Sequence, residues 1–490
     1  MRRTTFAFLA VVFTAVALVG VALRIVADPH ASVGKNVLVN KPGIVEAHNS
    51  PSLARDPRAP ETVVATHRID RPNFSAALNR STNGGRTWQT TALPLPPGSD
   101  RPFAPDAAFG PDGTLYVTYV NLEGSGNVPA NLWLARSSDG GRSLSRPVRI
   151  AGRLAFQSRV VVDRAGTVHV TWLQAPDVAL FRLVGAPSPI VAAQSTDGGR
   201  TFSRPVQVSD PNRVRVGAAS PVVDSHGRLV VLYEDFKNDR RDFENLPGPP
   251  PSQPFALVVT RPVGARGFSQ GVELENRVVS ARRFLVFLPE FPSLAAGPDD
   301  TLYVAWSDGR SGDEDVFLRR SDDGGGTWSP ARRVNDNPRR DGTSQYLPRV
   351  GVSPDGRVDV VFLDRRRDRK NVMTDATLAS SRDDGASFQN TRLSSRSFDS
   401  RVGASPAPQF PVDFGSRLGL VSRDGRSLAA WTDTRLGSAD TGRQDIFAAS
   451  YDVPRSAVVL ARAGVIAALL VLAGLSALIA ATWRGRERSR

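Results

Sequence analysis

Acidic and arginine side chains recur together in the second half of the chain, and they are the residues best suited to chemistry. Three segments place an arginine one or two residues after an aspartate: Asp308-Gly309-Arg310, Asp364-Arg365-Arg366 and Asp433-Thr434-Arg435. Arginine binds a carboxylate through two parallel hydrogen bonds, and two carboxylic acids can act as acid and base on a glycosidic bond. One interpretation is a cup that binds a carboxylate or a sugar, with the following ligand-binding residues: Asp308, Arg310, Arg349, Asp364, Arg365, Asp433 and Arg435.

The same segments also fit a structural role, in which each aspartate forms an ion pair with the arginine that follows it and holds its own loop. A binding site normally uses different residues in successive units of a repeat, whereas this pattern returns almost unchanged. The repetition therefore favours the structural interpretation over the ligand cup.

Other kinds of reactive site are not indicated by the sequence. The chain has no cysteine, which excludes disulfides, thiolate metal ligands and a cysteine nucleophile. The five histidines are scattered: His30, His48, His67, His169 and His226. We find no glycine loop that would cradle a phosphate and no Ser/His/Asp arrangement, so we predict no cofactor and no metal ion.

Repeated strands must position these side chains. A turn followed by an alternating strand recurs every 50 to 75 residues, at 112–119, 166–172, 227–233, 300–306, 356–362 and 425–431, with a weaker copy at 62–67. Each copy has a short strand before it and two strands after it, so one unit contains four antiparallel strands. The sequence therefore predicts an all-β fold, a β-propeller over residues 34–453 with seven blades, or six if the first copy is not a full blade.

The last unit stops after its third strand, at 446–451, and would leave an unpaired edge. Residues 35–40 resemble the fourth strands of other units, notably 331–335. We therefore expect this N-terminal segment to complete the last blade and to close the ring.

The turns between third and fourth strands share the pattern Ser-x-Asp-x-Gly-x-x-Trp/Phe. It occurs, with small variations, from Ser81, Ser137, Ser195, Ser321 and Ser381. These turns resemble the Asp-box (bacterial neuraminidase) repeats of the sialidase superfamily, and the likeness covers residues 45 to 453. The resemblance implies that the turn aspartates support folding on the rim of one face, and that ligands bind in a central funnel on the opposite face.

The resemblance also implies where catalysis would occur. Sialidases use three arginines for the substrate carboxylate, a tyrosine nucleophile assisted by a glutamate, and an aspartate as acid and base. Here the candidate catalytic residues are Tyr346, Glu290 and Asp364, and the candidate clamp is Arg310, Arg349 and Arg435. The family's Arg-Ile-Pro motif is only approximated by 68–72, where an aspartate stands in the place of proline.

Three functions remain open at this point. The first is a non-catalytic module that binds glycan or protein ligands, and the second is a sialidase-like glycoside hydrolase of the exo-alpha-sialidase type. The third is a scaffold for the assembly of membrane complexes.

Two apolar segments predict that the propeller is attached to the cell membrane. Residues 4–23 form an uncharged run behind two arginines, which indicates a signal sequence or an uncleaved signal anchor over 1–27. Residues 463–483 carry no charge and would span about 31 Å as a helix, which predicts a transmembrane helix over 458–483. The basic residues of 484–490 predict a cytoplasmic tail, so the propeller would face the extracytoplasmic side.

The net charge of +14 is largely explained by the chain ends. Nine arginines and one glutamate in the terminal segments contribute eight of these charges, and only about +6 is left for the middle of the chain. This charge is too diffuse for a groove that follows a phosphate backbone. We therefore predict a membrane and a glycan or protein ligand as partners, and no nucleic acid.

Overall fold

The computed structural model describes residues 31–453, except 97, 100, 125–126, 177–186, 238–252, 265–266, 280–289 and 405–411. The segments predicted over 1–27, 458–483 and 484–490 lie outside the described residues. Among the residues described, no helix has the length and apolar character needed to cross a membrane. The chain divides into two units, Val33–Tyr451 and a second unit formed by the two ends, and the fold described here is that of Val33–Tyr451.

Seven antiparallel sheets, numbered here as blades in chain order, make up this unit. Blade 1 contains β3 (His48–Arg55), β4 (Val63–Ile69), β5 (Ser75–Ser81) and β6 (Gln89–Thr91). Blade 2 contains β7 (Pro102–Phe109), β8 (Leu115–Glu123), β9 (Val128–Ser137) and β10 (Val148–Ala151). Blade 3 contains β11 (Ala155–Val162), β12 (Val168–Gln174), β13 (Ile190–Ser195) and β14 (Val206–Gln207).

The remaining blades follow the same order. Blade 4 contains β15 (Val216–Val223), β16 (Leu229–Asp235), β17 (Phe255–Thr260) and β20 (Val272–Val278), with a small hairpin of β18 (Pro262–Val263) and β19 (Gly267–Phe268). Blade 5 contains β21 (Ser293–Ala296), β22 (Leu302–Asp308), β23 (Asp315–Ser321) and β24 (Arg332–Arg333). Blade 6 contains β25 (Gln345–Val352), β26 (Val358–Asp364), β27 (Met373–Ser381) and β28 (Gln389–Arg392), and β29 (Phe398–Asp399) also pairs with β27.

Blade 7 is completed by the N-terminal segment, as the sequence predicted. It contains β30 (Gly419–Arg423), β31 (Arg426–Asp433) and β32 (Asp445–Asp452), and β1 (Ser32–Val33) and β2 (Val37–Leu38) lie along β32. Val37 pairs with Ala448 in antiparallel register. Asn40 adds a buried tie, because its side chain accepts the Ile446 N–H at 2.7 Å and donates to Asp445 at 2.9 Å.

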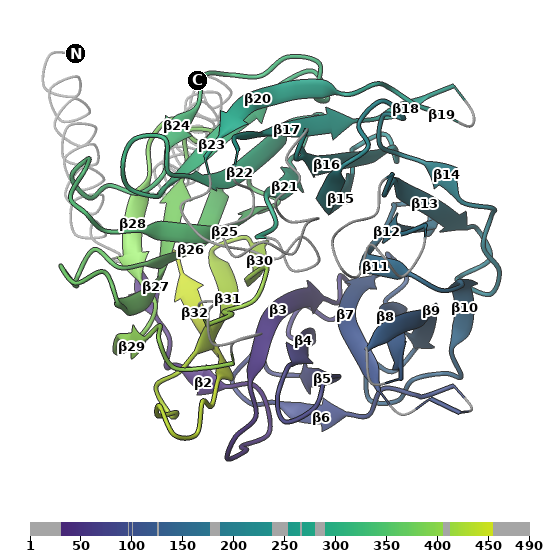
Figure 1. Cartoon of the computed structure of the whole chain (residues 1–490), viewed down its shortest axis with the longest axis horizontal. Helices are drawn as coiled ribbons and strands as arrows, with labels where there is room; N and C mark the ends of the chain where they lie inside the picture. The colour runs from purple at the N-terminus through teal and green to yellow at the C-terminus, as the bar shows by residue number, and fades with distance from the viewer. Residues whose placement is uncertain are drawn as a thin grey trace, which may run out of the picture. The chain divides into compact units, whose positions relative to one another are not determined.

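The innermost strands pack against one another in sequence and close a ring. β3 contacts β7, β7 contacts β11, and the order continues through β15, β21 and β25 to β30, which contacts β3 again. Figure 1 shows these strands around the centre, with the other strands of each blade outside them. The fold is a seven-bladed β-propeller, and the six-bladed alternative is wrong.

Each second strand is buried on both faces, which explains its apolar sequence. In β22, Leu302, Val304 and Trp306 pack into the core shared with blade 4. Tyr303 and Ala305, on the other face, pack into the core shared with blade 6. Side chains in a strand alternate between faces, so one strand contributes to two inter-blade cores.

The five Ser-x-Asp-x-Gly turns share one set of hydrogen bonds. In blade 5 the Ser321 hydroxyl accepts the Gly325 N–H at 2.8 Å and donates to Asp323 at 2.8 Å. Gly325 has a φ of +93°, which favours glycine, and a Cβ there would lie 3.3 Å from Val259 of the preceding blade. These turns therefore fix hairpins against neighbouring blades. The antiparallel strand order puts them on the face opposite to the starts of the innermost strands.

Candidate ligand site in the propeller funnel

A backbone bulge near the start of the innermost strands determines which side chains face the central channel. The pairing register shifts in β3, β7, β11, β15 and β25, and a residue with positive φ lies within each shift. A bulge of this kind re-aims the side chains that follow it. The residue two positions after the positive-φ residue is Ser52, Asp106, Arg159, Ser220 and Arg349 in these five strands.

Two further residues occupy the same position in the other blades. Arg417 stands two residues after Gly415, whose φ is +91°, and Ser293 follows the aligned Phe291-Pro292 segment. One residue from each blade thus forms a layer, which we call the channel ring: Ser52, Asp106, Arg159, Ser220, Ser293, Arg349 and Arg417.

The small members of the channel ring connect one blade to the next. Asp106 accepts the N–H of Val160 at 3.2 Å, and Ser293 accepts the N–H of Val350 at 3.0 Å. Ser220 accepts the N–H of Leu294 at 3.1 Å. Arginine has no acceptor atom, so an arginine at this position cannot make the equivalent tie. Arg159 instead pairs with Asp106 of blade 2 at 3.5 Å, and Arg417 donates a hydrogen bond to the Pro105 carbonyl of the same blade. Arg349 makes neither kind of contact with the described part of the chain, and blade packing does not explain it.

Arg159, Arg349 and Arg417 share a single nearby carboxylate, that of Asp106. This carboxylate lies 3.5 Å from Arg159 and 3.8 Å from Arg417, and it also accepts the Ser52 hydroxyl at 2.8 Å. Burial, together with the charge of Arg159, lowers the pKa of Arg349 to about 10. Burial and the neighbouring arginines hold the pKa of Arg417 well below its usual range. The channel ring therefore carries more positive charge than its own residues neutralise.

Several donors of these arginines have no acceptor. Arg159 is 4% exposed, and within the described part of the chain its Nε and Nη2 atoms have no hydrogen-bond partner. Arg417 is 8% exposed, and its Nε has no such partner there either. Arg349 is half-buried and forms no hydrogen bond or ion pair with the described part of the chain. Buried N–H groups normally have a partner, so these atoms mark places where an anion would be favourable.

Arg68 adds a fourth guanidinium group from the end of β4. It bonds to Asp70 at 2.9 Å and to Asp413 at 2.7 Å, and its guanidinium lies 5.6 Å from the centre of the Phe103 ring. Burial, and the nearby charge of Asp413, raise the pKa of Asp70. Arg68 is thus held by two carboxylates, unlike the arginines of the channel ring.

An aromatic pocket lies on the funnel side of the ring, at the starts of the innermost strands. Its volume is about 90 Å³. Arg68 and Arg417 line it together with four aromatic side chains: Phe74, Phe103, Phe156 and Phe291. Phe74 and Phe103 meet edge to face at 5.3 Å. The pocket combines aromatic surface with cationic groups.

A second cavity, which we call the channel cavity, lies further along the channel, toward the face with the Ser-x-Asp-x-Gly turns. Its volume is about 320 Å³, and Arg159, Arg349 and Ser220 are among its lining residues. The guanidinium of Arg159 lies 4.5 Å from the centre of the Phe291 ring, which lines the aromatic pocket. Phe291 and Arg159 thus form a boundary between the aromatic pocket and the channel cavity.

Acidic groups gather on the side of the funnel formed by blades 4 to 6. Burial and the proximity of Glu290 raise the pKa of Glu234 well above its usual range, which favours the protonated form of its carboxyl group. Glu290 accepts the Ser307 hydroxyl at 2.8 Å and the Leu347 N–H. The hydroxyl of Tyr346 accepts a hydrogen bond from Arg365 at 3.3 Å, and the Tyr346 ring lies beneath that guanidinium. Tyr346 is only 1% exposed.

The repeated Asp and Arg segments lie at the ends of the second strands and are paired among themselves. The Asp308 carboxylate accepts the backbone N–H of Arg310 at 2.9 Å and the Nε–H of its side chain at 2.6 Å. The Asp433 carboxylate accepts the same two groups of Arg435, each at 2.9 Å. Arg310 also bonds to Glu275 at 3.1 Å.

Asp364 follows the same pattern with Arg366, whose backbone N–H it accepts at 3.0 Å and whose Nε lies at 2.5 Å. Burial raises the pKa of Asp364 and of Asp433. Of the three arginines proposed as a clamp, Arg310 and Arg435 are thus held by their own aspartates. Arg349 alone lies in the channel ring.

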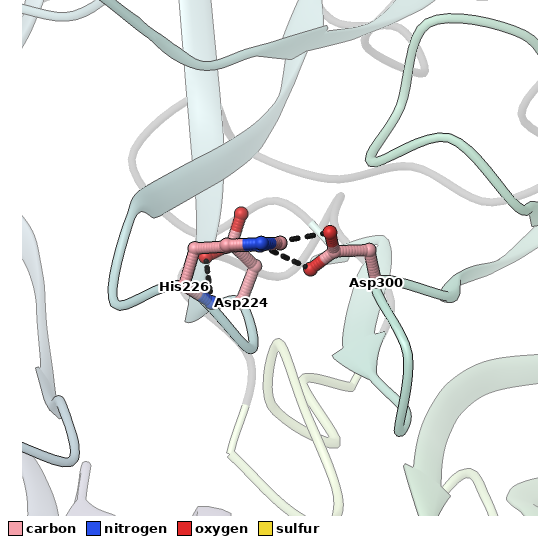
Figure 2. A group of neighbouring side chains, drawn as sticks. All are labelled: Asp224, His226 and Asp300. Atoms are coloured by element: carbon pink, nitrogen blue, oxygen red, sulfur yellow. Dashed lines mark hydrogen bonds and ion pairs between the residues drawn. The ribbon is translucent and has the colours of Figure 1, made fainter.

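One group of potential metal ligands was not foreseen from the sequence. Asp224, His226 and Asp300 bring their ligand atoms within 4.8 Å of one another, between the first turns of blades 4 and 5 (Figure 2). The His226 Nδ1 lies 2.8 Å from Asp300, and the Arg228 Nε lies 2.6 Å from Asp224. Each carboxylate already has a cationic or hydrogen-bonding partner, so this group ties two blades together and gives no reason to place a metal ion there.

Arg159, Arg417 and Asp106 are funnel residues that the sequence did not indicate as site residues. A signal for them was present, because the innermost strands align on the motif of Phe291-Pro292-Ser293. In that alignment, Arg159 and Arg417 fall on the same position as Arg349. The shared position in this alignment therefore indicates the residues of the channel ring.

Neither a protein-family model nor a curated protein matches the chain. Solved structures with a similar fold include a protein of unknown function from Dyadobacter fermentans DSM 18053, with 13% identity over 87% of this chain and 100% of that chain and a TM-score of 0.48. An ulvan lyase of family PL25 shows 10% identity over 83% of this chain and 95% of that chain, with a TM-score of 0.47. The Hadza microbial sialidase Hz136 shows 18% identity over 71% of this chain and 66% of that chain, with a TM-score of 0.43.

Proposed function

We propose that the propeller is a binding module for an acidic glycan, whose carboxylate enters the aromatic pocket and pairs with Arg417. The observation that carries this proposal is the charge of the channel ring. Three arginines share the carboxylate of Asp106, and Arg417 presents at the aromatic pocket a buried Nε that has no acceptor within the described part of the chain. A ligand carboxylate would supply both the missing acceptor and the missing charge.

The aromatic side chains suit a sugar attached to that carboxylate. Phenylalanine rings pack against the apolar faces of pyranose rings, while polar groups fix their orientation. The pocket of about 90 Å³ holds a carboxylate group more readily than a whole sugar ring. The ring of the sugar would therefore lie against Phe74 and Phe103 near the mouth of the pocket.

We further propose that the module is displayed on the outside of a cell membrane. The apolar segment at 463–483 with its basic tail, and the apolar segment near the N-terminus, support this arrangement. The five turns that resemble Asp-boxes support a relationship to sialidase-like propellers. A protein ligand with an exposed acidic side chain is the alternative occupant of the same pocket.

A glycoside hydrolase is the second candidate function, and one observation favours it. Burial and the neighbouring Glu290 raise the pKa of Glu234, and a carboxyl group with a raised pKa is what a general acid requires. In its favour, Tyr346 lies on the same side of the funnel. Against it, the Tyr346 ring is buried beneath Arg365, so a substrate would first have to displace that arginine.

Titration calorimetry with the full chain in mild detergent tests the binding proposal. The probes are sialyllactose, a trimer of galacturonic acid, and lactose as the neutral control. We expect an acidic probe to bind and lactose not to bind. Arg417→Met should weaken that binding by about tenfold or more, because it removes a charge-assisted hydrogen bond.

Arg142→Met is the matched control, since Arg142 is exposed on a Ser-x-Asp-x-Gly turn and should leave binding unchanged. Equal binding of lactose, or full affinity in Arg417→Met, would refute the binding proposal. Release of sugar from the acidic probes, lost in Glu290→Gln, would establish the hydrolase instead.

A further inference from the structure

The channel cavity is a separate feature from the aromatic pocket and has a different lining. Its volume of about 320 Å³ is roughly ten times the volume that one water molecule occupies in the liquid. Its polar lining consists of Arg55, Arg159, Arg349, Ser52, Ser220, Asp106 and Ser422. Most of these groups are hydrogen-bond donors, and Asp106 is the one carboxylate among them.

The donors of this cavity are only partly used. The Nε and Nη2 atoms of Arg159 lie on the same edge of the guanidinium, and neither has a hydrogen-bond partner among the described residues. This edge is the one that binds two oxygens of a carboxylate or phosphate in parallel. Ser220 uses its oxygen to accept the Leu294 N–H, so its own proton is available to donate. The cavity therefore offers two parallel N–H donors of Arg159, the guanidinium of Arg349 and the hydroxyl of Ser220.

The positive charges of the arginines around the cavity exceed the negative charge that Asp106 supplies. Among the residues that the structure describes, Asp106 is the only carboxylate that pairs with Arg159, and it also contacts Arg417, Ser52 and the Val160 N–H. Within the described residues, no acidic group forms an ion pair with Arg349. An arginine below the surface without a counter-ion is costly, because the charge has lost part of its hydration and has gained no partner.

We propose that the channel cavity binds a small oxyanion, such as inorganic phosphate, between Arg159 and Arg349. Two oxygens of the anion would accept the Nε–H and Nη2–H of Arg159, and the remaining oxygens would face Arg349 and the hydroxyl of Ser220. This anion is a structural component of the propeller and is separate from the ligand of the aromatic pocket. It supplies negative charge to Arg159 and Arg349, which Asp106 alone does not balance.

Thermal unfolding of the full chain in detergent tests the proposal with inorganic phosphate as the probe. A ligand that binds only the folded state raises the unfolding temperature, and at a hundredfold excess over its dissociation constant the shift for a domain of this size is about 3 °C. We expect this shift with phosphate and not with sodium chloride at the same ionic strength. An equal response to both salts would reflect screening of charge and would overturn the proposal.

Arg349→Met is the decisive variant, with Arg142→Met as the control for loss of one positive charge. We expect Arg349→Met to lose the phosphate-dependent shift and to unfold, without phosphate, at the wild-type temperature or above it, because the variant removes an uncompensated charge. Arg142→Met should keep the shift. Arg417→Met should also keep it while losing the acidic glycan, which separates this cavity from the aromatic pocket. A phosphate shift that persists in Arg349→Met would overturn the proposal.

A crystal soaked with selenate in place of phosphate gives a second measurement that does not depend on a variant. The expected result is an anomalous peak between the guanidinium groups of Arg159 and Arg349. A cavity without a peak, at a selenate concentration that raises the unfolding temperature, would overturn the proposal.

Discussion

A buried ion pair between blades 6 and 7 gives the sharpest prediction about stability. Arg357 and Asp359 have fully buried side chains. The Nε of Arg357 lies 3.0 Å from the Asp359 carboxylate, and its Nη2 donates to the Ser427 hydroxyl at 2.8 Å and to the Arg423 carbonyl at 3.0 Å. Asp359 also accepts the hydroxyls of Ser422 and Ser427, so one network joins the two blades.

Arg357→Met would leave the carboxylate of Asp359 buried with two hydroxyl donors and no cation. Breaking a buried pair on one side costs about 3–5 kcal/mol, which corresponds to roughly 4–6 °C in unfolding temperature for a domain of this size. The double variant Arg357→Met/Asp359→Leu should recover most of this loss, because replacing both charges by apolar side chains removes the unpaired group.

Urea unfolding followed by tryptophan fluorescence measures the three proteins under the same conditions. The single variant should be the least stable, and the double variant should lie within about 1–2 kcal/mol of the wild type. If Arg357→Met loses less than about 1 kcal/mol, or if the double variant is as unstable as the single one, the account of this buried pair is wrong.

Three further predictions concern other parts of the propeller. Burial lowers the pKa of His48 to about 4 and that of its neighbour His67 well below the ordinary value near 6.5. The unfolded chain therefore binds more protons, and stability should fall as the pH drops from about 6.5 to about 4. His48 alone should account for about 3 kcal/mol of this loss, and His67 should add to it. His48→Gln should reduce the slope, which calorimetry at several pH values would measure. Asp323→Ala removes the acceptor of the Ser321 and Thr327 hydroxyls and of two backbone N–H groups, and should cost about 1–2 kcal/mol in urea unfolding without changing glycan affinity. Asn40→Leu removes the buried tie of the closing strand and should speed hydrogen exchange of β32, whereas an unchanged exchange rate there would show that β2 does not hold the ring closed.

The fold was largely predictable because its elements repeat. Alternating strands, glycine turns and the likeness of 35–40 to 331–335 were enough to predict four-stranded blades and a closing N-terminal strand. The predicted membrane segments and their topology remain predictions. Each repeated feature could be read from local sequence, since strand period and turn chemistry act over a few residues.

The candidate site was less predictable because it depends on backbone conformations that the residue types at those positions do not indicate. The bulges place Ala104, Gln157 and Leu347 at positive φ, where glycine or asparagine would normally indicate such a conformation. Their effect is to bring Asp106, Arg159 and Arg349 into one layer, although long stretches of chain separate these residues. The paired segments ending in Arg310 and Arg435 were visible in the sequence, and the structure uses both arginines in ion pairs with their own aspartates.

The most direct test of the central claim is a crystal structure of the chain with an acidic oligosaccharide such as sialyllactose. The account predicts that the sugar carboxylate lies in the aromatic pocket, within hydrogen-bond distance of the Arg417 guanidinium. A sugar bound instead at the rim, against the pairs of Asp308 with Arg310 or Asp433 with Arg435, would contradict it.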